Sequence, residues 1–123
     1  MALLGKRILV VEDEPLIALD LEAAIKESRG IVVGPAQCLA DALRLASSEP
    51  LHGAIVDLRL RNEPASDVIH CLRQRGVACV VHTGQSDATL AISWPDIPVI
   101  DKPALPEAVL AVLAEQMKKS SQP

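Results

Sequence analysis

The stretch His52-Gly53-Ala54-Ile55-Val56-Asp57 decides the fold, because it places a carboxylate directly after a run of apolar residues. An unbroken apolar run is typical of a parallel strand that is buried on both faces of its sheet. In open α/β sheets, ligands bind outside the carboxyl ends of such strands. Asp57 is therefore a candidate site residue, and other strands are expected to end in a similar way.

Polar side chains follow three more apolar runs at the same position: Glu12 and Asp13 after residues 8–11, Thr83 after residues 77–82, and Lys102 after residues 98–100. Packing alone does not explain three acids and a lysine at the ends of separate apolar runs. Taken alone, the first acid pair would be better explained as a solvated turn at the start of a helix, where carboxylates are favourable. The ordered set as a whole predicts one site.

The spacing of apolar residues predicts five strands, at Arg7–Val11, Ile31–Ala36, Gly53–Asp57, Val77–His82 and Pro98–Ile100. It also predicts five helices, at Pro15–Arg29, Leu39–Ser48, Ala65–Arg75, Ser86–Ser93 and Leu105–Lys119. Strands that alternate with helices indicate an α/β fold, with a doubly wound five-stranded parallel sheet and helices on both faces. Residues Arg61 to Glu63 are expected to form only a polar loop.

The composition indicates one soluble domain, since 123 residues match the size of a single domain and half of them are hydrophobic. We expect residues 6–117 to form its core and residues 118–123 a polar tail. Because the chain has no Phe, no Tyr and one Trp, the core must be aliphatic.

The same numbers exclude several classes of function. A net charge of -4 argues against binding to nucleic acid or to an anionic membrane surface. No apolar run is long enough to span a bilayer, and the first residues lack the layout of a signal peptide. The three cysteines, Cys38, Cys71 and Cys79, are odd in number and have no metal-ligand spacing, so we expect small buried residues in a reducing cytosol. We therefore expect a cytoplasmic protein.

The acids at the strand ends predict a divalent metal. Glu12 and Asp13 stand where a nucleotide-binding fold would need glycines, and three neighbouring carboxylates would repel one another and any phosphate without a cation between them. Hard oxygen ligands suit Mg²⁺. A carboxylate such as Asp57 can act as a nucleophile toward phosphorus, while the Thr83 hydroxyl and the Lys102 amine can bind phosphoryl oxygens.

This ordered set resembles the receiver domain of two-component response regulators, over residues 6–117. The motifs that carry the resemblance are Ile8-Leu9-Val10-Val11-Glu12-Asp13-Glu14-Pro15, Ile55-Val56-Asp57-Leu58, His82-Thr83-Gly84 and Lys102-Pro103. The resemblance implies a CheY-like, flavodoxin-like sheet of strand order 2-1-3-4-5. It also implies that Asp57 is the phosphoacceptor and that Thr83 and Lys102 bind the phosphoryl oxygens.

The resemblance extends to the metal site. It implies that Asp13, Asp57 and the backbone carbonyl of Arg59 bind Mg²⁺ directly, while Glu12 reaches the ion through water. It further implies that the peptide bond between Lys102 and Pro103 is cis.

The sequence departs from the family at two places. Most receivers carry Tyr or Phe three residues before the lysine, where this chain has Val99, so the usual aromatic switch cannot operate. The segment between Thr83 and Lys102 is also short, so the helix over Ser86–Ser93 is expected to be reduced. Because nothing follows the last predicted helix, we expect a stand-alone receiver that signals through protein–protein contacts or acts as a phosphate sink.

Three functions remain open. The leading hypothesis is a phosphorylation switch, not an enzyme, that receives its phosphoryl group from a sensor histidine kinase or a histidine phosphotransfer protein and binds an unidentified downstream protein. An aspartyl-phosphate phosphatase would commonly need a second Asp two residues after Asp57, where this chain has Arg59. A pseudo-receiver that binds partners without phosphorylation is the other alternative, which Val99 leaves open.

Overall fold

The computed structural model of the chain describes residues 3–84 and 93–120. Its main sheet has five parallel strands in the order β2-β1-β3-β6-β7. Their bounds are β1 Arg7–Val11, β2 Ile31–Ala36, β3 Gly53–Val56, β6 Ala78–Thr83 and β7 Val99–Asp101. This order is the predicted 2-1-3-4-5 arrangement, since β6 and β7 are the fourth and fifth strands of the main sheet, so the flavodoxin-like fold is confirmed.

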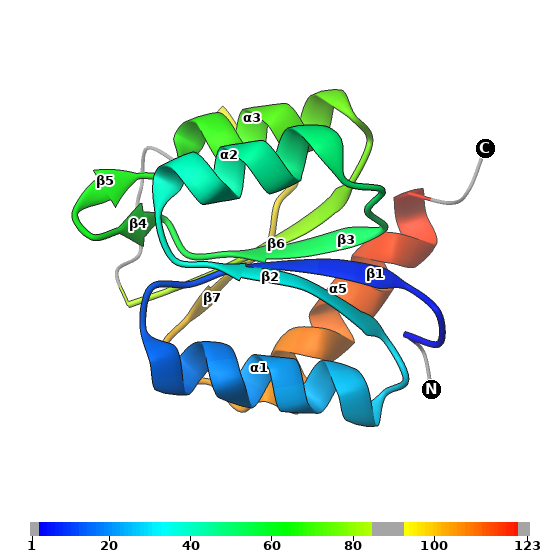
Figure 1. Cartoon of the computed structure of the whole chain (residues 1–123). Coiled ribbons are helices and arrows are strands. Elements are labelled where there is room, and N and C mark those ends of the chain that lie inside the picture. Colours follow the sequence, from blue (N-terminus) through cyan, green and yellow to red (C-terminus); the bar gives the residue numbers. More distant parts are fainter. Residues whose placement is uncertain (1–2, 85–92, 121–123) are drawn as a thin grey trace.

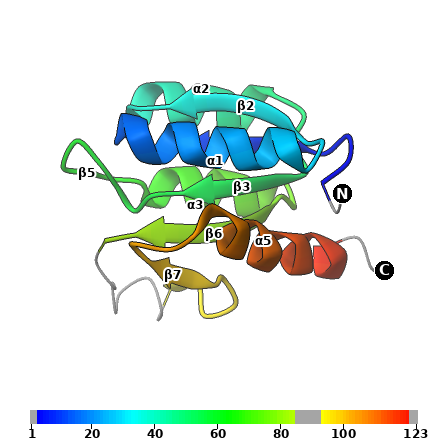
Figure 2. The same cartoon turned by 90° about the horizontal axis from the view of Figure 1, so that it is seen from below.

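Within the described residues, four helices cover the two faces of this sheet (Figure 1). α1, Pro15–Glu27, and α5, Pro106–Ser120, lie on one face, and α2, Leu39–Ser48, and α3, Ser66–Gln74, lie on the other. Figure 2 shows the same layers after a quarter turn, with β7 at the edge of the sheet beside β6. The sheet is therefore buried between two pairs of helices, as the unbroken apolar strands predict.

The apolar residues of each strand divide between two aliphatic cores. Successive side chains along a strand point to opposite faces. Accordingly, Ile8 and Val10 belong to the core under α1 and α5, while Leu9 and Val11 belong to the core under α2 and α3. All four side chains are 0–1% exposed. The fold thus buries β1 from Ile8 to Val11, which leaves no room along this stretch for a site except at its end.

The strand registers bring the carboxyl ends of the central strands together. Val11 pairs with Val56, and Val56 pairs with Val81 on the next strand. Farther along, Thr83 pairs with Asp101. Residues that follow these positions therefore gather along one edge of the sheet, which is where the sequence places its polar side chains.

One predicted loop is wrong. Arg61 to Glu63 do not form only a polar loop, because β4, Arg59–Leu60, pairs antiparallel with β5, Glu63–Pro64, as a short hairpin. Arg61 and Asn62 occupy the two turn positions with φ angles of 50° and 70°. Two successive positive φ angles are the geometry of a two-residue hairpin turn, which usually takes Asn and Gly.

The remaining helix and strand boundaries agree with the predicted ones to within a few residues. α1 ends at Glu27, two residues before the predicted end, because Arg29 takes a φ of 64° and Gly30 closes the turn by donating its N–H to the Ile25 carbonyl at 2.9 Å. The helix expected over Ser86–Ser93 falls almost entirely outside the described residues. No helix in the described ranges has both the length and the apolarity that crossing a membrane requires.

Candidate functional site

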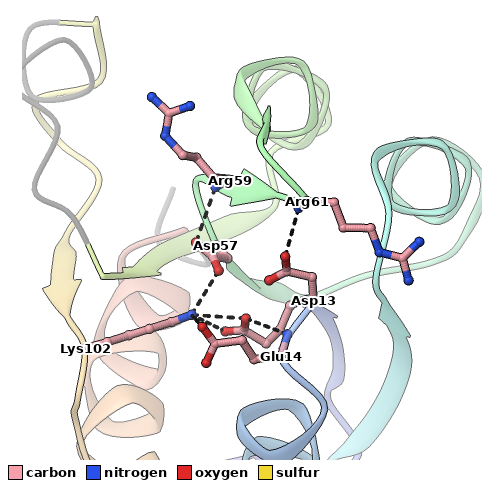
Figure 3. A network of polar contacts seen from close by, with 7 residues as sticks. Asp13, Glu14, Asp57, Arg59, Arg61 and Lys102 are labelled. Atoms are coloured by element: carbon pink, nitrogen blue, oxygen red, sulfur yellow. Dashed lines mark hydrogen bonds and ion pairs between the residues drawn. The ribbon is translucent and has the colours of Figure 1, made fainter.

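Three carboxylates converge at the carboxyl edge of β1 and β3, as predicted. The backbone holds them there: the Glu12 N–H donates to the Ala36 carbonyl at 2.9 Å, and the Asp57 N–H donates to the Val11 carbonyl at 2.9 Å. These hydrogen bonds continue the sheet ladder one residue beyond each strand. Carboxylate oxygens of Glu12, Asp13 and Asp57 lie within 4.8 Å of one another. Figure 3 shows this cluster from close by.

Lys102 bridges two of these acids. Its ammonium nitrogen lies 2.9 Å from Oδ2 of Asp57 and 2.9 Å from Oε1 of Glu12 (Figure 3). Its backbone N–H donates to the carbonyl of Thr83 at 2.8 Å, which ties the lysine to the end of β6. The peptide bond between Lys102 and Pro103 is cis, as the family resemblance implies. The lysine is therefore placed to neutralise the cluster from the side of β7.

Burial dominates the electrostatics of the cluster. Glu12 is 1% exposed, and its burial raises its pKa to about 7 despite the hydrogen bond from Lys102, with a further increase from the charge of Asp57. Burial also acts on Lys102 and lowers its pKa, but the hydrogen bonds to Asp57 and Glu12 outweigh this effect, so that the pKa is raised overall. The lysine stays charged, whereas Glu12 can exchange a proton near neutral pH.

The β4–β5 hairpin supplies two backbone contacts to the acids. The Arg59 N–H donates to Oδ1 of Asp57 at 3.3 Å, and the Arg61 N–H donates to Oδ2 of Asp13 at 2.8 Å (Figure 3). The Ala65 N–H bonds to the Leu58 carbonyl, so Leu58 and Ala65 form a hydrogen-bonded pair. In an antiparallel ladder such pairs alternate with pairs that exchange no hydrogen bonds, and the next pair is Arg59 with Pro64. The N–H and C=O groups of Arg59 therefore point away from the facing strand.

Sequence reasoning missed the contact from Arg61. The sequence contains only a weak signal for the turn that positions this N–H, since only Asn62, a residue that tolerates positive φ, marks it. The side chain of Arg61 is exposed, so the residue acts on the site through its main chain.

Thr83, His82 and Val99 lie on the two strands beyond β3. Thr83 ends β6 and is 3% exposed, beside the strand that carries Asp57. His82 precedes it and is also 3% exposed. Val99 begins β7 and is 38% exposed, so an aliphatic side chain stands at the surface where most receivers place an aromatic one.

The donor set fits a small, hard divalent cation. Three carboxylates supply oxygen ligands within a few ångströms, and Mg²⁺ takes one or two carboxylates together with water and other oxygens. The chain offers neither a thiolate nor an imidazole within the same cluster among the described residues, so a thiophilic metal is disfavoured.

Comparison with known proteins agrees with this geometry. No family model matches the chain. Solved structures of response regulator receiver domains superpose on it with TM-scores up to 0.85 at 20% sequence identity, which shows the fold. SdrG from Sphingomonas melonis is 35% identical, with a TM-score of 0.75, and the match covers 92% of this chain and 98% of SdrG.

Two more proteins are similar to the chain. A response regulator from Burkholderia pseudomallei, solved with a phosphorylated aspartic acid, a calcium ion and citrate, is 26% identical with a TM-score of 0.79; the match covers 94% of this chain and 72% of the other. The photosynthetic apparatus regulatory protein RegA of Cereibacter sphaeroides is 37% identical over 102 residues, which are 79% of this chain and 54% of RegA.

The five-stranded parallel sheet with helices on both faces places the chain in the flavodoxin-like class of α/β proteins. Within that class, the chain belongs to the CheY-like receiver domains of response regulators. The chain spans between 44% and 63% of the length of the curated regulators that it matches.

Proposed function

We propose that this receiver domain is a phosphorylation switch that accepts a phosphoryl group on Asp57. The observation that carries the proposal is the position of Lys102, whose ammonium nitrogen lies 2.9 Å from both Asp57 and Glu12. A cation held beside a nearly buried carboxylate can transfer its hydrogen bonds to phosphoryl oxygens once these arrive. The related response regulator that carries a phosphorylated aspartic acid supports this assignment.

Mg²⁺ is the proposed cofactor. Asp13, Asp57 and the outward-pointing carbonyl of Arg59 would bind it directly, and Glu12 would reach it through water. When bound, the ion would neutralise charge on the phosphoryl oxygens and favour an in-line transfer. The hydrogen bond from Arg61 holds the Asp13 carboxylate in position for this role.

The transfer is a displacement at phosphorus. A carboxylate oxygen of Asp57 attacks the phosphorus of a phosphohistidine, so that a P–O bond forms while the P–N bond breaks and the leaving imidazole takes a proton from solvent. Lys102 and the Thr83 hydroxyl bind the equatorial oxygens. Water later attacks the phosphorus, which releases inorganic phosphate and restores the carboxylate. The protein is thus a phosphoacceptor with self-catalysed loss of phosphate, rather than an enzyme acting on other substrates.

The proposed partners follow from this chemistry. The phosphoryl donor is a sensor histidine kinase or a histidine phosphotransfer protein in the cytoplasm, and the receiver of the signal is a downstream protein. Because Val99 replaces the usual aromatic side chain, the conformational change caused by phosphorylation must reach the partner by another route.

The test is incubation of the chain with Mg²⁺ and acetyl phosphate, followed by mass spectrometry of the intact protein and of its peptides. We expect one phosphoryl group on Asp57, no label in Asp57→Asn, and normal label in Asp41→Asn, which changes an exposed acid on α2. An unlabelled chain that still binds Mg²⁺ would contradict the proposal and favour the pseudo-receiver. Repeated turnover of a phosphate ester would instead indicate a phosphatase.

A further inference from the structure

His82 is a buried polar side chain that the proposed phosphoryl chemistry does not use. The residue is 3% exposed, and neither ring nitrogen has a hydrogen-bond partner among the described residues. Both nitrogens are also closed to solvent, so a water molecule cannot supply the missing contact. Buried polar side-chain atoms nearly always have a partner, and an exception calls for a physical explanation. The described contacts thus hold this ring by packing and not by hydrogen bonds.

The unpaired ring makes this conformation unfavourable by itself. Burial and the positive charge of Lys102 lower the pKa of His82, so the ring is neutral and carries one donor and one acceptor. A buried group without its hydrogen bond costs enough to change a conformational equilibrium by about 5- to 150-fold. The surrounding fold holds the ring in place against this cost, and a modest change around the ring is enough to release it.

The two residues proposed to bind the phosphoryl oxygens lie on either side of His82. Thr83 follows it directly at the end of β6, and the Thr83 carbonyl accepts the backbone N–H of Lys102 at 2.8 Å. His82 itself pairs with Ile100 of β7, two residues before Lys102. The ammonium group of Lys102 is bound to two carboxylates, each 2.9 Å away, and phosphoryl oxygens would draw it out of this arrangement. A phosphoryl group therefore acts on the strand that carries the ring and on its neighbour.

The His82 side chain lies on the α1 and α5 side of the sheet. Successive side chains along β6 alternate between the two faces, and Val80, two residues earlier, belongs to the core under α1 and α5. A cavity of about 450 Å³ lies on this side, and His82 is among the residues that line it. The cavity has room for an imidazole ring and several water molecules, since one water needs about 30 Å³. A rotation of the side chain can therefore bring its nitrogens into contact with solvent.

We propose that His82 is the conformational switch of this receiver, in place of the aromatic residue that Val99 replaces: phosphorylation of Asp57 releases the ring from its buried position into the cavity beside it. The inference rests on the proposed function, because Asp57 must first accept a phosphoryl group. The shift of Thr83 and Lys102 toward the phosphoryl oxygens loosens the packing around the ring, and hydration of its nitrogens favours the new position. Packed elements respond to such small shifts by changing between discrete arrangements. The signal then appears at the cavity walls, at the start of α1 and in the loop before α5, rather than around Val99.

The experiment measures whether the His82 ring becomes accessible to diethyl pyrocarbonate, which modifies neutral imidazole at an exposed nitrogen. The chain is incubated with Mg²⁺ at about pH 7, where the ring is neutral, with and without acetyl phosphate. Mass spectrometry of the peptides then reads both the label on Asp57 and the modification of each histidine. We expect slow modification of His82 without acetyl phosphate and an increase of about 5- to 150-fold in the labelled chain. His70, which is exposed on α3, is the internal reference and should react equally fast in both samples.

The outcomes separate the switch from the proposed function. Asp57→Asn should show neither the label nor a gain in His82 modification. Label on Asp57 without any gain at His82 would overturn the switch and leave the phosphoacceptor role standing, whereas an unlabelled wild-type chain would overturn both. A His82 ring that reacts as fast as His70 before phosphorylation would also overturn the switch, because the ring would then have no buried position to leave.

The variant His82→Leu distinguishes a switch from a histidine with a structural role. Leu removes both unpaired nitrogens and stays apolar, so the thermal midpoint of the unphosphorylated chain should rise, whereas loss of a structural histidine would lower it. The control His70→Leu should leave the midpoint unchanged. Asp57 should still be labelled in His82→Leu, but the NMR shifts that phosphorylation causes at the methyl groups of Ile17 and Leu21, which line the cavity, should be lost. A lower midpoint, or methyl shifts of wild-type size, would overturn the proposal.

Discussion

Replacement of Glu12 by Gln should remove a specific pH dependence from the stability of the metal-free protein. Burial raises the pKa of Glu12 from its ordinary value of 4.5 to about 7. The folded state therefore binds a proton more tightly than the unfolded state does. Protonation of Glu12 therefore stabilises the folded state. This contribution to the free energy of unfolding is fully present below about pH 4.5 and is lost as the pH rises through about 7. A difference of about 2.5 pH units corresponds to about 3 kcal/mol, or about 1.4 kcal/mol for each pH unit.

The assay is urea denaturation followed by circular dichroism, in EDTA, at several values between about pH 5 and about pH 8. Glu12→Gln cannot ionise, so the free energy of unfolding of the wild type should fall relative to this variant by about 2–3 kcal/mol over that range. The control Glu115→Gln changes an acid whose side chain is 65% exposed on α5, and it should keep the wild-type slope. Parallel curves for Glu12→Gln and the wild type would refute the reasoning.

Three further outcomes are expected. Without divalent ions, Lys102→Met should lower the free energy of unfolding by about 3 kcal/mol, because it leaves two acids uncompensated. The same variant should bind Mg²⁺ more tightly, as measured by NMR titration. Gly34→Ala should cost about 2 kcal/mol in urea denaturation, since the residue has a φ of 92° and a Cβ would lie 2.8 Å from the backbone nitrogen two residues later. Its control is Gly84→Ala, where a Cβ meets no described atom within 4 Å, and a similar loss in both would argue against this cause. The double change Arg61→Asn and Asn62→Gly should raise the free energy of unfolding by up to about 1 kcal/mol, because Gly accepts a positive φ without a steric cost. The thermal midpoint should rise accordingly, and a lower midpoint would contradict this.

The sequence predicts the candidate site well because of one geometric rule. Parallel strands that are buried on both faces end at a common edge, so polar residues after separate apolar runs must meet. Glu12, Asp13, Asp57 and Lys102 do meet, although they come from three different parts of the chain. Their roles in phosphorylation stay predictions, since geometry alone does not test chemistry.

Side-chain and turn conformations were harder to predict. The double ion pair of Lys102 depends on which way a long, flexible side chain turns, and no local pattern in the sequence specifies that choice. The hairpin was missed because Arg61 and Asn62 adopt positive φ without a glycine, so the usual signal of such a turn is absent. Neither ring nitrogen of His82 could be assigned a partner, or the lack of one, before the fold was known.

The aliphatic core has an optical consequence. Trp94 is the sole aromatic side chain of the chain, and it packs against the core beneath α2 and α3. Two contacts hold its segment: the Ile97 N–H donates to the Trp94 carbonyl at 3.1 Å, and Arg73 of α3 forms an ion pair with Asp96 at 2.6 Å. Ultraviolet fluorescence from this protein therefore comes from a single position near the outer strand β7. A change in emission during signalling would report a rearrangement at that position, without interference from any other chromophore.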